Sequence, residues 1–476
     1  MRYDLLIRGG RVIDPRHGRD IRADVGIHGN VIAAVGSDLP TSGADQVLDV
    51  DGQWVVPGLI DPHVHVSSEF NGQFAHAMLV KAGVTTALDM AGPVKDVLAI
   101  ASKHGTGLNL AILDRIKPGE RVADASPTDA TIQHVVEESL NNGAFGVKVL
   151  GGHYPLTPDA TRRIFEAANK AGCWAAFHCG TTETGSNLHG LREAVEILKG
   201  LHVHIAHINS YCRGAVKRAE EEALEAIDLL SANPEFMSES YLAVINGTWG
   251  KIINGQPESG TCRNSLQQQD YSDDEAGLRQ AILDGYARVH ARSGDQTVLL
   301  TGLDGVAEWE QRGTNTGMSF PVNPPAPRSM LATAKDAAGR FVVDAIATDG
   351  GGIPRNDQIS SGMRLVQLNM LTPAEFVLKT SWQPATLLGL GDKGHLGDGA
   401  DADITILDPV RAEARTTVIG GEVVMHEGIV FGRGATILSD RRGVEAVKKH
   451  GLVSQVVSLQ DSGFYGGREV RAWVAS

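Results

Sequence analysis

The sequence predicts an α/β protein: a (β/α)8 barrel of the TIM type with a small β-sandwich domain formed from both chain ends. The middle of the chain alternates apolar, strand-like runs with helical stretches, which is typical of a barrel. Both ends consist instead of short strands separated by turn residues. Lys148, His178 and His207 each lie near the end of a strand-like run and recur about every 30 residues, the length of one βα unit.

The sandwich is predicted from two separated segments. Residues 1–56, with "YDLLIRGGRVID" and "ADVGIHGNVIAAVG", alternate apolar and polar residues between Gly, Asp and Asn. Residues 394–436 return to this pattern in "DADITILDP" and "TTVIGGEVVMHEGIVFG". Residues 57–393 are therefore expected to form the barrel as a domain inserted into the sandwich. Residues 437–476 form a C-terminal extension to which the sequence assigns no role.

Eight strand candidates follow one another in the predicted barrel. They lie in "GLIDPHVHV", "GVTTALDMAG", "LNLAILDRIK", "FGVKVLGG", "CWAAFHCG", "HVHIAHINS", "FMSESYLAV" and "FVVDAIATDGG". Helical stretches such as "PDATRRIFEAANKAG" lie between them. An open doubly wound sheet would show the same alternation, but no GxGxxG follows an early strand, which weakens that alternative.

Composition excludes several classes of protein. The net charge of −14 argues against a nucleic-acid partner or an anionic membrane surface. No apolar run is long enough to span a bilayer, and the N-terminus shows no apolar core of a secretory signal. The four cysteines have no CxxC spacing. A cytoplasmic protein is the simplest expectation.

Histidine and aspartate side chains lie at the ends of several predicted strands. His63 and His65 share one face of the first strand, because alternate side chains of a strand point the same way. His178 ends "CWAAFHCG", His207 ends "HVHIAHINS" and Asp349 ends "FVVDAIATDGG". The carboxyl ends of barrel strands meet at one rim, where catalytic residues gather. Imidazole and carboxylate together suit Zn²⁺ and related divalent ions.

Two assignments within this set need a choice. In the sixth strand, His202, His204 and His207 compete, and we favour His207 because it lies nearest the carboxyl end. We expect His204 in the barrel interior and His202 in a structural role. Lys148 lies near the end of a buried strand, where burial lowers the pKa of its amine. It is either paired with Asp89 or Asp114 across the barrel or a neutral amine that reacts with CO₂ to give a carbamate.

The motifs "PGLIDPHVHV", "GVKVLGGHYP", "AAFHCG", "IAHINS" and "IATDGGG" resemble the metal motifs of the amidohydrolase superfamily. The resemblance is greatest to its hydantoinase, dihydroorotase and D-aminoacylase branch, and it extends from residue 1 to about residue 430. It implies two divalent metal ions, with Zn²⁺ expected and Mn²⁺, Fe²⁺ or Co²⁺ as alternatives. It also implies a ligand for each role, namely His63, His65 and Asp349 for one ion, His178 and His207 for the other, and carboxylated Lys148 as the bridge.

The resemblance further implies hydrolysis of a non-peptide C–N bond. A metal-bridging hydroxide would attack the carbonyl, and Asp349 would act as general base and then general acid. A small-molecule cyclic amide, such as a hydantoin, dihydropyrimidine or lactam, is the first expectation for the substrate. D-aminoacylases typically have a cysteine where this chain has Lys148, so N-acyl amino acid deacylation comes second. The superfamily's deaminases usually lack the bridging lysine, which counts against deamination.

A non-catalytic scaffold of the same fold is the remote third alternative. Such relatives of dihydropyrimidinase have lost metal ligands, whereas this chain offers all six. Enzymes of this branch commonly assemble, so a homodimer or homotetramer is expected.

Several residues near the predicted rim are candidates for substrate contacts. The resemblance implies that Tyr154 or His153, just after Lys148, supports the oxyanion. Arg115 and Arg213 could bind a carboxylate through two parallel hydrogen bonds. Asn209 and Tyr211 lie in the loop after the sixth strand.

The stretch between Tyr241 and Asp349 is far longer than the roughly 30 residues of one βα unit. It is rich in Gly, Asn, Pro and Ser, with a helix predicted over 275–294. Long irregular segments in compact domains are usually functional or disordered. We therefore expect part of this insertion to cover the rim and to contact substrate, with Tyr241 and Asn246 as the nearest candidates.

Overall fold

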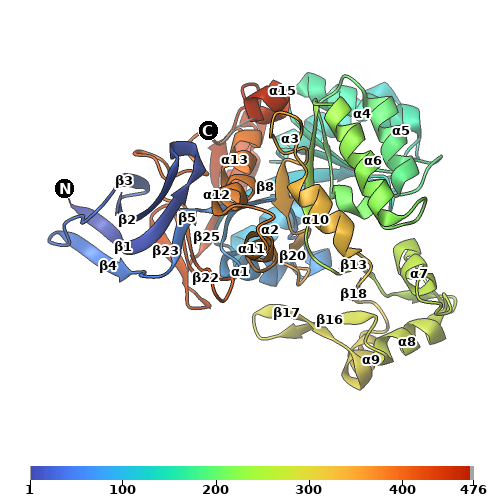
Figure 1. Cartoon of the computed structure of the whole chain (residues 1–476). Coiled ribbons are helices and arrows are strands. Elements are labelled where there is room, and N and C mark those ends of the chain that lie inside the picture. Colours follow the sequence, from blue (N-terminus) through green and yellow to red (C-terminus); the bar gives the residue numbers. More distant parts are fainter. Residues whose placement is uncertain (1, 472–476) are drawn as a thin grey trace.

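The computed structural model describes residues 2–471, and it confirms the predicted barrel and sandwich (Figure 1). The barrel strands run parallel, each paired with the next. The last strand has two segments, of which β19 pairs with β12 and β20 pairs with β6, so the sheet closes. The barrel strands are β6 (Leu59–His65), β7 (Val84–Asp89), β8 (Thr106–Ile116), β9 (Gly146–Leu150), β10 (Trp174–His178), β11 (Val203–Ile205), β12 (Phe236–Tyr241), β19 (Ala345–Ala347) and β20 (Gly350–Gly351).

Helices cover the outside of the barrel. Helix α4 shows why they form where they do: the Thr157 side chain accepts a hydrogen bond from the Ala160 N–H at its start, and Gly172 ends it with φ of 68°. The helices are α1 (Gly72–Lys81), α2 (Val94–His104), α3 (Asp129–Asn141), α4 (Pro158–Ala171), α5 (Leu188–Leu198), α6 (Ala219–Ala232), α10 (Pro325–Thr333), α11 (Gln358–Gln367), α12 (Pro373–Val377) and α13 (Gln383–Leu387). No helix of the described residues is long and apolar enough to cross a membrane.

The sandwich is a nine-stranded, mostly antiparallel sheet to which both chain ends contribute. Strands β5 and β21 join the two ends through antiparallel pairing. Its own apolar core contains Ile7, Val25 and Ile404. The strands are β1 (Tyr3–Asp14), β2 (Arg19–His28), β3 (Val31–Gly36), β4 (Ala44–Asp49), β5 (Trp54–Pro57), β21 (Ile404–Asp408), β22 (Glu413–Ile419), β23 (Glu422–His426) and β24 (Ile429–Val430).

The insertion after β12 is a small folded unit with its own buried core, which includes Leu278, Trp309 and Phe320. Figure 1 shows it in yellow and yellow-green, projecting from the barrel. The helix predicted over 275–294 is only half right, because α8 ends at Leu283 and the chain continues into a hairpin. The elements are β13 (Asn246–Trp249), β14 (Ile252–Ile253), β15 (Gln256–Pro257), α7 (Gly260–Gln267), α8 (Glu275–Leu283), β16 (Arg288–Ser293), β17 (Gln296–Leu300), α9 (Gly302–Gln311) and β18 (Gly317–Phe320).

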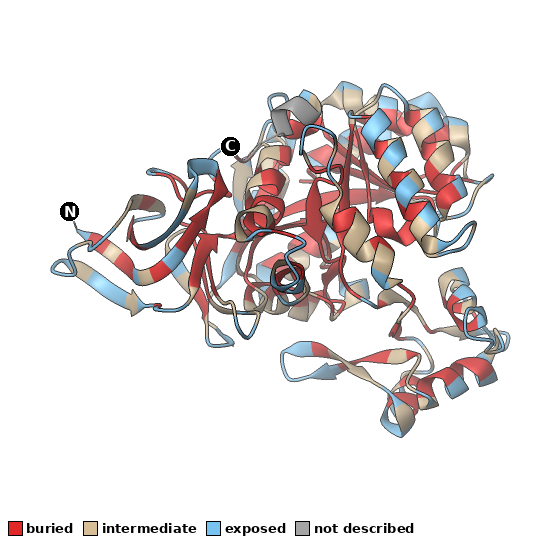
Figure 2. Cartoon of the chain, viewed as in Figure 1, coloured by how far each residue is buried: buried red, intermediate tan, exposed pale blue. Residues whose placement is uncertain are grey.

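The C-terminal extension packs on the barrel, and it shares an apolar cluster with sandwich residues such as Val424. Strand β25 (Gly434–Ser439) pairs with the first half of β8, whereas the second half of β8 pairs with β9. Strand β26 (Val453–Val456) pairs with β25, and α14 (Val444–Lys449) and α15 (Gly463–Arg471) complete the extension. Leu438, Leu459 and Phe464 join the apolar cluster inside the barrel. Figure 2 shows how completely the barrel strands are buried.

Candidate metal centre

Three predicted ligands converge at the carboxyl end of the barrel. His63 and His65 end β6, and Asp349 lies between β19 and β20. Asp349 Oδ1 lies 2.9 Å from His65 Nε2 and 3.3 Å from His63 Nε2. One ligand atom from each residue falls within 4.8 Å of the others. Because imidazole nitrogens and a carboxylate oxygen point at one place, the group can hold a divalent cation.

The remaining histidine pair lies beside this group. His178 ends β10 and His207 follows β11, and His207 Nε2 lies 3.1 Å from His178 Nδ1. Burial lowers the pKa of both rings well below the usual value, so both are neutral, the form that binds metals. The His63 and His207 rings stack at 5.2 Å, which places the second pair against the first group.

Lys148 lies in β9 and is 1% exposed. Its only hydrogen-bond partner among the described residues is the Met90 thioether, at 3.7 Å. Burial lowers the pKa of Lys148 to about 8, and its charge in turn lowers the pKa of His63, His178 and His207. The amine therefore acts on both histidine groups, and in the part of the chain that the structure describes no carboxylate forms an ion pair with it.

Arg355 holds Asp349, and sequence reasoning missed this contact. Its Nη2 lies 2.5 Å from Asp349 Oδ2, and its Nε donates to the Asp349 carbonyl at 2.6 Å. Asp349 has a left-handed backbone with φ of 52°. Through its two contacts, Arg355 fixes both the side chain and the main chain of this residue. Burial raises the pKa of Asp349, but Arg355 and His63 lower it by more. The net pKa therefore lies well below its usual value.

Glu239 in β12 is the second residue that the sequence did not reveal. It is fully buried, and its Oε1 lies 2.6 Å from His63 Nδ1 and accepts a hydrogen bond from the His207 N–H, also at 2.6 Å. Burial raises the pKa of Glu239, but His63 and His204 outweigh it and bring the pKa to about 2. The side chain is thus an ionised carboxylate beneath the histidines.

The candidates for substrate contacts differ in how near they lie to the predicted metal ligands. The His153 ring lies 4.9 Å from the His178 ring, next to the predicted metal ligands. Tyr154 is 39% exposed and packs against Lys117. Arg115 is paired with Glu69 at 2.6 Å and with Glu120 at 3.3 Å.

Asn209 and Tyr211 brace the strand ends. The Tyr211 hydroxyl accepts from the Cys179 N–H at 2.9 Å, and Asn209 Oδ1 accepts from the Tyr241 N–H at 3.1 Å. Both side chains are buried, and the Tyr211 ring lies 5.6 Å from that of His207.

Arg213 joins the loop after β11 to the base of the insertion. Its Nη2 donates to the Tyr241 hydroxyl at 2.8 Å, and its Nε donates to Asn323 Oδ1 at 2.9 Å. The Tyr241 hydroxyl also lies 3.4 Å from Asn246 Oδ1. Burial lowers the pKa of His153 and His178, and the positive charge of Arg213 contributes a smaller lowering.

The insertion reaches the centre through two aromatic rings. Phe70, shortly after β6, packs on His65 with the two ring centroids 4.7 Å apart. Trp249 at the end of β13 meets Phe70 edge to face at 6.5 Å. The insertion is therefore in contact with the residues that cover His65.

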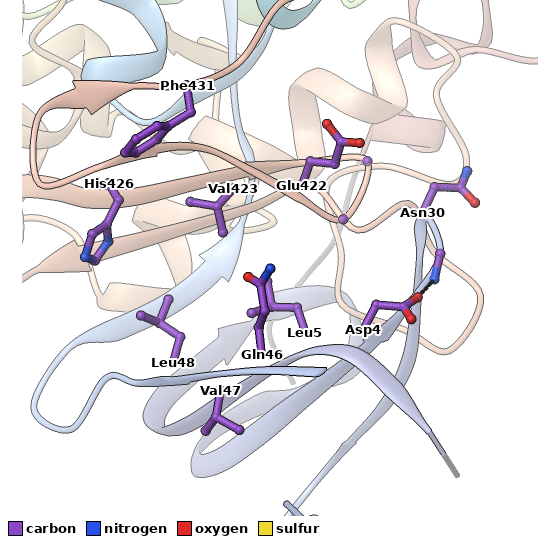
Figure 3. Close-up of a pocket in the computed structure, with 13 residues that line it drawn as sticks. Asp4, Leu5, Asn30, Gln46, Val47, Leu48, Glu422, Val423, His426 and Phe431 are labelled. Carbon is purple, nitrogen blue, oxygen red and sulfur yellow. Dashed lines mark hydrogen bonds between the residues drawn. The ribbon is translucent and has the colours of Figure 1, made fainter. Parts of the chain in front are cut away.

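A separate hollow of about 830 Å³ lies in the sandwich, between β4, β23, the start of β1 and the turn between β2 and β3 (Figure 3). Apolar side chains such as Val47 and Phe431 line much of it, with Asp4, Glu422 and His426 among them. None of the predicted metal ligands lines it, so it is not part of the candidate centre.

Comparison with known proteins agrees with this geometry. The amidohydrolase family profile matches residues 54–207 and 295–433. A dihydroorotase of Geobacter metallireducens is 23% identical and aligns with 88% of this chain and 99% of its own. A dihydroorotase of Pelotomaculum thermopropionicum is 27% identical, and the alignment covers 90% of this chain and 99% of that protein.

Solved structures share the fold. An N-acyl-D-glutamate deacylase from Bordetella bronchiseptica, complexed with zinc and a phosphonate inhibitor, superposes with a TM-score of 0.68 at 16% identity, covering 92% of this chain and 99% of the other. A D-hydantoinase gives a TM-score of 0.56 at 18% identity, covering 91% and 98%. The segments that match the family profile span more than half of the chain and contain all six predicted metal ligands, so this chain belongs to the amidohydrolase family.

Proposed function

We propose that this protein is a metal-dependent hydrolase of a non-peptide C–N bond, with a cyclic amide as the first candidate substrate. One observation carries the proposal: His63, His65 and Asp349 converge within 4.8 Å, and the His178–His207 pair stacks against them. Neutral imidazoles and an ionised carboxylate form the donor set that Zn²⁺ prefers, with Mn²⁺, Fe²⁺ or Co²⁺ as alternatives.

Lys148 would complete the centre as a carbamate. Its amine is buried with only a thioether neighbour, and its lowered pKa makes the neutral form accessible near neutral pH. The neutral nitrogen forms a bond to the carbon of CO₂ and releases one proton. The product is an anion with two oxygens, which can serve both histidine groups.

The chain's own residues would then direct the proton. When bound, two divalent cations polarise the amide carbonyl and acidify a water molecule. Asp349 is ionised, so it can accept the proton of the attacking water and return it to the leaving nitrogen. Arg355 holds the carboxylate in place during both transfers. His153, a neutral ring beside His178, is better placed than Tyr154 to donate to the carbonyl oxygen.

Arg213 favours a substrate that carries a carboxylate. Hydantoin and dihydropyrimidine rings are neutral, whereas an N-acyl amino acid ends in a carboxylate that a guanidinium can bind. N-acyl amino acid deacylation is therefore the second candidate function. A cyclic amide with a carboxylate on the ring would satisfy both the first candidate and Arg213.

A panel of amides tests the proposal. Metal-loaded protein would be assayed with cyclic amides and open-chain N-acyl amino acids, each as the free carboxylate and as its primary amide. We expect hydrolysis of one ring class, faster with the carboxylate, and none by His178→Asn. Wild-type protein that binds metal at full occupancy and hydrolyses no member of the panel would favour the scaffold alternative.

The insertion gives a second expected result. Trp249→Ala should raise KM about tenfold, equivalent to roughly 1.4 kcal/mol, with metal content unchanged, because it uncovers Phe70 above His65. Ile253→Ala is the matched control, since Ile253 is an exposed residue of the same insertion. Equal KM values for both variants would show that the insertion is only a surface addition.

We further propose a cytoplasmic enzyme that assembles as a homodimer or homotetramer, as the sequence leads us to expect. Size-exclusion chromatography with light scattering measures the assembly directly.

A further inference from the structure

A single buried carboxylate contacts both predicted metal-binding groups. Glu239 Oε1 lies 2.6 Å from the ring Nδ1 of His63, a ligand of the first group. The same oxygen accepts the backbone N–H of His207, a ligand of the second, also at 2.6 Å. Glu239 therefore joins two ligands that are far apart in the sequence and belong to different ions.

The contact with His63 selects one form of the ring. The short contact with a carboxylate oxygen, at 2.6 Å, favours the His63 tautomer that carries its proton on Nδ1 and donates it to Glu239. The lone pair of Nε2 then faces Asp349 Oδ1, on the side where the ligand atoms converge. Carboxylate–histidine pairs of this kind orient metal ligands and raise their basicity.

The contact with His207 stabilises an unusual backbone. His207 has a left-handed conformation with φ of 37°, which residues other than glycine adopt only at a cost in conformational energy. Its N–H points to Glu239 in this conformation. Without that acceptor, the turn that aims His207 at His178 would lose its fixed geometry.

The position of Glu239 is supported in turn by His204 and Trp174. Trp174 Nε1 donates to His204 Nδ1 at 3.3 Å, so the His204 proton resides on Nε2, which lies 3.4 Å from Glu239 Oε1. Trp174 in turn stacks on Phe464 of α15, with ring centroids 4.3 Å apart. All these side chains are fully buried, and they connect the C-terminal extension to the histidines.

We propose that Glu239 is a positioning residue that holds ligands of both metal ions in one geometry, and that the C-terminal extension supports it through Phe464, Trp174 and His204. The inference rests on the proposed metal centre. Glu239 lies outside the two segments that match the family profile.

Replacement of the carboxylate tests the inference. Glu239→Gln keeps the size but removes the charge that fixes the His63 proton. We expect metal affinity to fall roughly 10–100-fold, measured by competition of metal-stripped full-length protein with a chromophoric chelator for Zn²⁺. The Co²⁺ absorption spectrum should also change, which loss of stability alone would not produce.

Glu222→Gln is the matched control. Glu222 is equally buried and accepts hydrogen bonds from the N–H groups of Gly214, Val216 and Lys217, with no contact to a predicted ligand. This variant should lower the melting temperature but keep wild-type affinity and spectrum. Equal loss of affinity in both variants would overturn the inference, as would an unchanged affinity and spectrum in Glu239→Gln.

The contribution of His204, Trp174 and Phe464 is tested with separate variants. These variants also test the inference if Glu239→Gln does not fold. Trp174→Phe keeps an aromatic ring but removes the N–H that His204 accepts, and Phe464→Ala removes the stacked ring. Both should weaken metal binding severalfold, whereas Phe376→Ala, in a buried cluster elsewhere, should not. Wild-type affinity in Trp174→Phe would contradict the support by the extension. A wild-type protein that binds no metal would instead refute the proposed function itself.

Discussion

Lys148→Ala is expected to lose most of its bound metal and nearly all hydrolysis. The lysine is fully buried, and its charge lowers the pKa of histidines in both groups, so loss of its carbamate would remove a ligand from each. Metal content by elemental analysis and kcat with the best substrate of the amide panel measure the effect. Acetate or propionate should restore part of both, because a small carboxylate can occupy the space left by the side chain.

Lys379→Met provides the control for loss of a buried lysine. Lys379 is fully buried and donates to the Val343 carbonyl at 2.7 Å, with no predicted ligand in contact. This variant should retain metal and kcat even if it is less stable. A crystal structure with two fully occupied metal sites and an unmodified Lys148 amine would refute the carbamate.

Asp349→Asn should reduce kcat by about 10²–10⁴-fold, the usual range for a general acid–base group. The amide can still ligate through its oxygen, but it cannot accept the proton from water. Metal content should therefore fall much less than turnover. Parallel measurement of both quantities separates proton transfer from ligation.

Arg355→Lys is the companion variant for Asp349. It keeps a positive charge but loses the fork that contacts both the carboxylate and the carbonyl of Asp349. We expect a smaller loss of kcat than in Asp349→Asn. If Asp349→Asn loses metal and turnover in equal proportion, its role is that of a ligand only.

Most barrel strands could be predicted because each lies in a short, largely apolar run bounded by polar or glycine residues. The insertion shows where such reasoning fails. The run "EAGLRQAILDGYARVHARSG" looks helical throughout, yet Gly285 has φ of 80° and the chain turns there into β16. The hairpin of β16 and β17 pairs with β18, whose residues lie far along the chain, so local periodicity could not reveal it.

The candidate ligands stood out in the sequence for a similar reason, since His63, His65 and His178 lie at the end of an apolar strand and Asp349 closely follows one. Glu239 and Arg355 carry no such mark. Glu239 lies inside a strand, in "FMSESY", and its partners come from β6 and the loop after β11. Arg355 acts on a residue only six positions away, but through a turn whose path the sequence does not indicate. Long-range packing determines the contacts of Glu239, and the path of a local turn determines that of Arg355.

The position of β25 affects how the protein must be made. Its register partners in β8 are laid down more than 300 residues earlier, and the sandwich likewise needs strands from both ends of the chain. During translation, the early strands therefore have unpaired edges until β25 and the late sandwich strands emerge. Exposed strand edges invite pairing with other chains. Folding of this enzyme is consequently expected to finish only after β25 has been synthesised, and the early strands need protection from aggregation until then.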